Sequence, residues 1–183
     1  MSKGKNIILI ILVLAAVIVA AALGYGYLTN EYTPEESQAQ PGDPIPAPDF
    51  TVIDEKNMPV SLSNFRGKPT IVNFWATWCG PCEQELPFFD SAFKLYGDKV
   101  NFVMLNVDGD METVDEVKEF VRQRGYSFPL YFDVTYDASQ TYGVSAIPVT
   151  MCVSAEGDII WSKIGMVSED ELIRQIKSMT GAE

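Results

Sequence analysis

The chain has 183 residues, of which 47% are hydrophobic, and it carries 25 acidic and 13 basic side chains. This length suits one domain with an appendage, and three cysteines are too few for a framework of disulfide bonds. The sequence contains no histidine, which excludes Cys–His and Ser–His catalysis, histidine haem ligation and most zinc sites, because each needs an imidazole.

The first predicted element is a transmembrane helix within residues 1–28. Residues 7–23 contain no charged or strongly polar side chain, and residues 24–28 extend this stretch with two tyrosines. At about 1.5 Å per residue, the whole stretch crosses a hydrocarbon core of about 30 Å. Lys3 and Lys5 precede it and glutamates follow it, so the positive-inside rule places the amino terminus in the cytoplasm. We therefore expect a single-pass protein of the cell membrane with an extracytoplasmic domain.

A cleavable signal peptide is the alternative for the same segment, since Ala20-Ala21-Ala22 offers small residues to a protease. The hydrophobic region of a signal peptide usually spans only about 7–15 residues, which favours the retained anchor. Both interpretations export the rest of the chain.

Residues 29–47 are predicted to form a tether, because prolines, glutamates and glutamines dominate this segment and almost no apolar side chain is available for burial. The chain after the anchor contains 11 basic and 25 acidic residues, a formal charge of −14. This charge argues against nucleic acid or anionic lipid as a ligand. A solubilising surface is the default interpretation of this excess of negative charge, and a basic partner is the alternative.

Residues 48–183 have the pattern of one α/β domain. Helices are expected from about residue 82, over 112–124 and 137–142, and from Ser168, where Glu171 holds the capping-box position. Alternating strands and helices predict a central sheet that is covered on both sides. The strands are expected at 49–54, 59–62, 70–75, 100–107, 128–132, 149–154 and 158–164.

The segment Cys79-Gly80-Pro81-Cys82 follows the apolar strand at 70–75 and opens a helix. Two cysteines three positions apart at a helix start lie close enough to form a small disulfide ring, and the unpaired N–H groups there favour a thiolate. Cys79, at the helix tip, is the predicted nucleophile, and Cys82, one turn inside, is the shielded resolving thiol. An inert disulfide is one alternative. Half of a zinc site is another, for which two further ligands are lacking apart from Cys152 and carboxylates.

Residues 72–82, Val-Asn-Phe-Trp-Ala-Thr-Trp-Cys-Gly-Pro-Cys, resemble the thioredoxin superfamily, and most closely its membrane-anchored TlpA-like and ResA-like thiol–disulfide oxidoreductases. The resemblance covers about residues 48–180. It implies a thioredoxin-like central mixed sheet flanked by helices, with an inserted helix and strand between Met111 and Phe132. It also implies protein disulfide substrates, with apocytochrome c as a candidate, and a membrane thiol electron donor of the CcdA-like kind.

Glu85 lies one helical turn after Cys82, so its carboxylate is placed to approach that thiol; an ordinary solvated glutamate is the equal alternative from spacing alone. The resemblance favours a functional role, because the ResA-like group has a functional glutamate at this position. Asn73 stands where thioredoxin itself has a buried aspartate, and an amide cannot accept a proton near neutral pH. Any base role must therefore lie elsewhere than at position 73, and a buried Glu85 with a raised pKa could take the proton from Cys82.

The resemblance also places a substrate-binding surface around the cysteines. It assigns a cis-proline loop to Ile147-Pro148, where a missing backbone donor shapes a groove for an extended peptide. Gly80 and Pro81 form the dipeptide typical of thioredoxin-like reductants, and Trp78 is expected to be exposed at the rim. Cys152 is interpreted as a small buried hydrophobe and Asp108-Gly109-Asp110 as a turn rather than a cation loop.

The predicted function is an extracytoplasmic thiol–disulfide oxidoreductase that reduces protein disulfides through the cysteine pair, without a cofactor or metal. A disulfide-forming oxidase is the nearest alternative. A peroxiredoxin-like peroxidase is another, although its Thr-x-x-Cys site does not match, since Thr77 stands two residues before Cys79. A non-catalytic binding module with a structural disulfide is the third.

Overall fold

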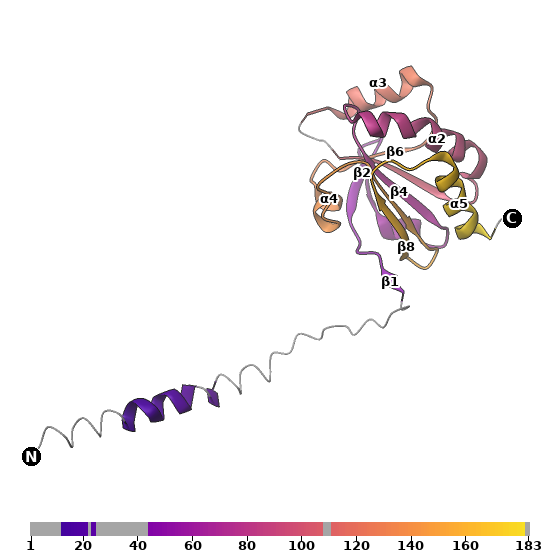
Figure 1. Ribbon diagram of the computed structural model, residues 1–183. Helices are drawn as coiled ribbons and strands as arrows, with labels where there is room; N and C mark the ends of the chain where they lie inside the picture. Colours follow the sequence, from indigo (N-terminus) through magenta and orange to yellow (C-terminus); the bar gives the residue numbers. More distant parts are fainter. Residues whose placement is uncertain (1–11, 22, 25–43, 108–110, 182–183) are drawn as a thin grey trace, which may run out of the picture. The chain divides into compact units, whose positions relative to one another are not determined.

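The computed structural model describes residues 12–21, 23–24, 44–107 and 111–181 (Figure 1). The chain divides into two units, Met1–Asp43 and Pro44–Glu183. In the first unit, residues 12–21 and 23–24 are helical. Within the described ranges, no helix has both the length and the apolar character that a membrane crossing requires. Most of the predicted anchor, and the predicted tether up to residue 43, lie outside the described residues.

The second unit is built on a mixed sheet with strand order β1-β8-β7-β4-β5-β6-β2-β3. The β4–β5 and β5–β6 pairs are parallel and the others are antiparallel. The strands are β1 (Ile45–Pro46), β2 (Thr51–Asp54), β3 (Pro59–Ser61), β4 (Thr70–Trp75), β5 (Asn101–Asn106), β6 (Leu130–Phe132), β7 (Val149–Val153) and β8 (Asp158–Ile164). The helices of this unit are η1 (Leu62–Phe65), α2 (Gly80–Tyr96), α3 (Val114–Arg124), α4 (Asp137–Thr141) and α5 (Glu169–Thr180).

Two hydrophobic cores cover the two faces of this sheet, as the alternation of elements predicted. Every residue of the central strand β4 is buried, and successive side chains point to opposite faces. Ile71 and Trp75 belong to the core under α2, α3 and α5, whereas Val72 and Phe74 belong to the core under α4 and η1. Figure 1 shows α2, α3 and α5 on one side of the sheet and α4 on the other. The thioredoxin-like α/β fold is therefore confirmed.

The sheet begins earlier than the sequence pattern indicates, inside the segment assigned to the tether. In β1, Ile45 lies opposite Ile159 and Pro46 opposite Asp158 of β8. A proline is tolerated here because β1 is an edge strand, where one row of backbone groups needs no partner. The pattern could not reveal a strand of two residues.

One helix start and one predicted cap differ from expectation, whereas α5 starts after Ser168 as predicted. Helix α2 begins at Gly80 rather than near Cys82, since Cys79 caps it and a proline fits its first turn. At α5, the Ser168 hydroxyl accepts a hydrogen bond from the Glu171 N–H at 3.3 Å, but the Glu171 carboxylate pairs with Lys163 instead of completing a capping box. A full capping box occurs at α3, between Thr113 and Glu116.

Candidate redox site at the start of helix α2

The cysteine pair lies where β4 gives way to α2. Cys79 and Cys82 form a disulfide with a Cα–Cα distance of 5.2 Å. Cys79 is the N-cap of α2, and its sulfur accepts a hydrogen bond from the Cys82 N–H at 3.2 Å. In the reduced protein, the same N–H and the helix dipole would stabilise a thiolate at Cys79. Cys79 is 5% exposed and Cys82 fully buried, so an incoming sulfur reaches Cys79 first.

An apolar groove opens beside Cys79. It has a volume of about 570 Å³, and Cys79 lines it together with Trp78, Gly80, Pro81 and Ile147. The structure therefore brings four of the five predicted substrate-binding residues to one surface. Trp78 is 56% exposed, as expected for a residue at the rim.

The fifth predicted substrate-binding residue, Pro148, lies behind this surface. The Ile147–Pro148 peptide bond is cis, in agreement with the expectation for this loop. Pro148 is buried, and its carbonyl accepts a hydrogen bond of 2.8 Å from the Gly165 N–H at the end of β8. It therefore supports the groove through the backbone, while Ile147 contributes the surface.

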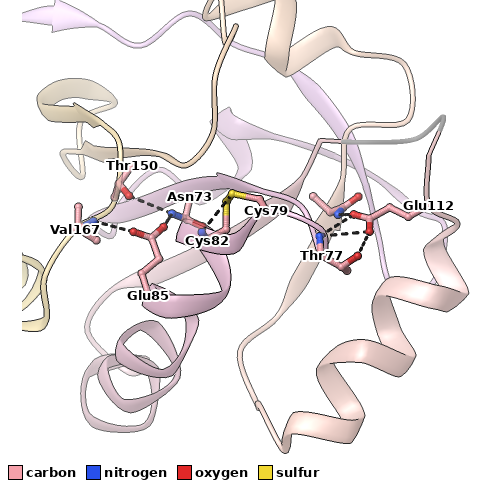
Figure 2. The surroundings of a disulfide bond; sticks show 9 residues. Asn73, Thr77, Cys79, Cys82, Glu85, Glu112, Thr150 and Val167 are labelled. Atoms are coloured by element: carbon pink, nitrogen blue, oxygen red, sulfur yellow. Dashed lines mark hydrogen bonds between the residues drawn. A yellow bond between two sulfur atoms is a disulfide. The ribbon is translucent and has the colours of Figure 1, made fainter.

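Glu85 is fully buried, and each of its carboxylate oxygens accepts a hydrogen bond (Figure 2). Asn73 Nδ2 donates to Oε1 at 2.8 Å, and the Val167 N–H donates to Oε2 at 2.8 Å. Burial raises the pKa of Glu85 from 4.5 to about 7, against the lowering effect of these two donors and of the Lys163 charge. A carboxyl group with such a pKa exchanges its proton near neutral pH, which an exposed glutamate does not.

Asn73 connects Glu85 to the neighbouring strand. Its Nδ2 donates a second hydrogen bond, of 3.1 Å, to the hydroxyl oxygen of Thr150, which lies directly opposite on β7. Both hydrogens of the amide are thereby used, and among the described residues its buried Oδ1 finds no partner. Asn73 thus acts as a fixed donor toward Glu85.

A second buried carboxylate, that of Glu112, holds the loop that precedes the cysteines. Its Oε1 accepts a hydrogen bond of 3.1 Å from the Thr77 N–H, and it also binds the Thr77 hydroxyl and the Asn106 amide. Sequence reasoning assigned Glu112 to a helix and missed this role. The Thr113–Glu116 capping pattern was the available signal, since it starts α3 after Thr113 and leaves Glu112 free to turn inward.

Cys152 packs in the core as a small hydrophobe. It is fully buried opposite Ile71 of β4, and burial raises the pKa of its thiol to about 12. Within the described part of the chain, no cluster of three or more His, Cys, Asp or Glu side chains is arranged to hold a metal ion. The predicted turn at Asp108-Gly109-Asp110 lies outside the described residues.

Comparisons with known proteins agree with this geometry. The Redoxin family model matches residues 40–178. The chain is 32% identical over 181 residues to the thiol-disulfide oxidoreductase ResA of Bacillus cereus, with 98% of this chain and 99% of that protein covered. It is 30% identical to ResA of Bacillus subtilis over 153 residues, covering 83% of this chain and 82% of that one.

Solved structures show the same relationship. A putative thiol:disulfide interchange protein DsbE from Chlorobium tepidum superposes with a TM-score of 0.67 at 28% identity, covering 78% of this chain and all of that one. StoA from Bacillus subtilis superposes with a TM-score of 0.61 at 27% identity, covering 73% and 98%. The chain therefore belongs to the Redoxin family and is a ResA-like member of the thioredoxin superfamily.

Proposed function

We propose that this thiol–disulfide oxidoreductase reduces disulfide bonds of protein substrates through Cys79 and Cys82. The observation that carries the proposal is the position of Cys79, which caps α2 at the floor of an apolar groove while Cys82 is buried one turn further on. A purely structural disulfide would need neither a groove beside it nor helix N–H groups at its sulfur.

The reaction proceeds in two exchanges. The Cys79 thiolate attacks one sulfur of the substrate disulfide, forming a mixed disulfide and releasing the other substrate sulfur as a thiolate. Cys82 then loses its proton and attacks the Cys79 sulfur, which releases the second substrate thiolate and leaves Cys79 and Cys82 joined. The substrate gains two electrons and the enzyme loses them, and the two protons that the Cys79 and Cys82 thiols release to their surroundings balance the two that the substrate thiolates take up from water.

Glu85 is the proposed acid–base group for the second exchange. Cys82 is fully buried, so bulk water does not reach its proton. Glu85 lies one turn along the same helix, is buried itself, and has a pKa of about 7, so that its ionised form can accept this proton near neutral pH. Asn73 and Val167 hold the carboxylate in place for the transfer.

The proposal also includes the side of the membrane on which the redox domain lies and the source of the electrons that reduce its disulfide. The apolar residues 7–23 support a membrane anchor with residues 44–183 outside the cytoplasm, and the ResA matches extend over 98% of this chain. Returning the disulfide to the dithiol requires two electrons from a membrane thiol carrier, for which the resemblance suggests the CcdA-like kind. Apocytochrome c, before haem attachment, is the proposed substrate class.

Trapping tests the order of attack. A Cys82→Ser variant should accumulate a mixed disulfide on Cys79 that mass spectrometry can identify, whereas Cys79→Ser should not. Absence of any linked protein from Cys82→Ser would contradict the proposed order.

The reduction potential tests the direction. A reductant should lie nearer the thioredoxin value of about −270 mV than the DsbA value of about −120 mV. A value near the latter would instead support a disulfide-forming oxidase.

A further inference from the structure

A row of polar side chains runs across the sheet from Glu85 toward solvent. Asn73 of β4 lies opposite Thr150 of β7, and Thr150 lies opposite Lys163 of β8. Directly opposite residues on neighbouring strands project from the same face of a sheet. Lys163 therefore shares the face on which Asn73 binds Glu85, and it stands at the end of the row, with a side chain that is 35% exposed.

Helix α5, which packs on this face of the sheet, contributes to the same arrangement. Lys163 forms an ion pair with Glu171 in the first turn of α5, whose side chain is 22% exposed. Between these two residues in the chain lies Val167, the backbone donor to Glu85. The segment from the end of β8 to the first turn of α5, residues 163–171, thus supplies Glu85 with a hydrogen bond and a cation, and it supplies that cation with an acidic partner.

We propose that the Lys163–Glu171 pair controls the charge of Glu85, with Lys163 stabilising the ionised carboxylate and Glu171 binding the ammonium group away from it. Lys163 is in this sense a positioning residue for the exchange reaction. The inference rests on the acid–base role of Glu85 proposed above. Neither residue of the pair lies within residues 72–82 or the Ile147-Pro148 loop.

The other described groups around Glu85 are uncharged, so the control of its charge is assigned to Lys163. On α2 the neighbouring titratable group is Cys82, which is held in the disulfide. On β7 it is Cys152, whose pKa of about 12 keeps it neutral. Asn73 and Thr150 carry no charge. Among the described residues, Lys163 of β8 is the charged group that acts on the Glu85 carboxylate, and Glu171 of α5 is the partner of that lysine.

Two substitutions should shift the titration of Glu85 in opposite directions. Lys163→Met removes the favourable cation, so the Glu85 pKa should rise. Glu171→Gln releases the ammonium group and removes an anion, so the pKa should fall. The matched controls are Lys177→Met, in the last turn of α5, and Glu169→Gln, in its first turn, which change the net charge equally. Neither control should move the titration.

The direct readout is the pH titration of the Glu85 side-chain carboxyl carbon, followed by NMR in the oxidised, full-length protein, in which Cys79 and Cys82 do not titrate. Glu85→Gln identifies the signal. The kinetic readout uses an aromatic disulfide reagent that releases one coloured thiolate on Cys79 attack and a second on resolution by Cys82. The rate of the second step should be measured against pH. The pH at its midpoint should follow the Glu85 pKa measured by NMR, rising for Lys163→Met and falling for Glu171→Gln.

The outcomes separate the two proposals. If Glu85→Gln slows the second step by about 10²-fold or more, the acid–base role stands. If the Glu85 titration then does not move in Lys163→Met, or moves equally in Lys177→Met, the charge control proposed here is wrong. An unchanged second step in Glu85→Gln would overturn the acid–base role, while opposite NMR shifts in the two variants would still support the control of charge.

Discussion

Asn73 on β4 donates a hydrogen bond of 2.8 Å to Glu85 on α2, and this contact joins the two elements that flank the cysteine pair. Since the amide is fixed by Thr150 at its other hydrogen, it stays a donor and favours the ionised carboxylate. Burial acts in the opposite direction and is the larger effect. The balance puts the pKa of Glu85 close to neutrality, where proton exchange with a thiol is most useful.

The raised pKa of Glu85 predicts that stability declines as the pH rises. The folded chain keeps a proton, up to a pKa of about 7, that the unfolded chain releases near 4.5. Folding therefore binds a proton between these values, and Glu85 should cost about 3 kcal/mol of unfolding free energy across that window, with no further cost above it. Urea unfolding at a series of pH values should show this decline, and Glu85→Gln should remove it.

A matched comparison is available at Glu116, an exposed carboxylate whose pKa is lowered by its hydrogen bonds to Thr113. Glu116→Gln should leave the decline between pH 4.5 and 7 in place. A decline that persists unchanged in Glu85→Gln would assign it to other groups.

Gly80 offers a way to change the reactivity of Cys79 with little effect on the fold. A Cβ atom placed on Gly80 meets no atom within 4 Å, and the residue occupies the first turn of α2. Gly80→Glu would place a negative charge beside the Cys79 thiolate and raise its pKa, whereas Gly80→Lys would lower it. Alkylation rates of the reduced protein against pH should separate the two variants, with wild type between them.

Salt provides the control for this pair. Because the introduced side chains are exposed, the difference between Gly80→Glu and Gly80→Lys should shrink as ionic strength rises. Equal alkylation profiles at low salt would show that Cys79 does not respond to charge at the helix start.

Glu112 should matter for both stability and the rate of Cys79 attack. Glu112→Gln replaces one acceptor oxygen by a donor that cannot serve the partly buried Thr77 and the buried Asn106, which should cost about 1–3 kcal/mol of unfolding free energy. Because Thr77 stands two residues before Cys79, the loop would loosen and attack on a disulfide should slow. Denaturant unfolding and the first-step rate measure the two effects.

Asp115→Asn is the control for Glu112→Gln, since it alters an acidic residue in the first turn of α3. Its effect on stability should stay within about 0.5 kcal/mol. A first-step rate that is unchanged in Glu112→Gln would confine this carboxylate to stability.

Trp78 should contribute to the recognition of proteins and little to the chemistry. Trp78 is 56% exposed and lines the groove beside Cys79, so it offers apolar area to an incoming chain. Trp78→Ala should lower kcat/KM for a protein disulfide by about tenfold, the effect of losing about 1.4 kcal/mol of contact. The rate with a small aromatic disulfide, which cannot span the groove, should change little.

Trp75→Phe is unsuitable as the control because Trp75 is fully buried in the core. Met166→Ala, at a position that is 42% exposed after β8, removes a similarly exposed apolar side chain outside the lining of the groove. Equal losses in Met166→Ala and Trp78→Ala would show that the effect is not specific to the groove.

Patterns within short stretches of the sequence determined much of this fold. The alternation of strands and helices, and the position of the cysteines at the start of α2, follow from apolar periodicity and from residue types that open helices. These signals depend on neighbours along the chain, so they can be read without the tertiary structure. The short edge strand β1 was not predicted, because two residues are too few to show an alternating pattern.

The sequence by itself determined that two thiols stand one turn apart where a helix begins, since that spacing is local. That spacing also placed Glu85 near Cys82, but only the tertiary structure decided that Glu85 is buried, which groups bind it, and that Glu112 binds the loop before the cysteines. Asn73 and Val167 reach Glu85 across 12 and 82 positions, and Thr77 reaches Glu112 across 35. Such contacts depend on the order β8-β7-β4-β5 in the sheet and on α5 packing against α2, which bring distant segments together and exclude water. Burial then shifts the proton affinity of Glu85, and no local pattern encodes that burial.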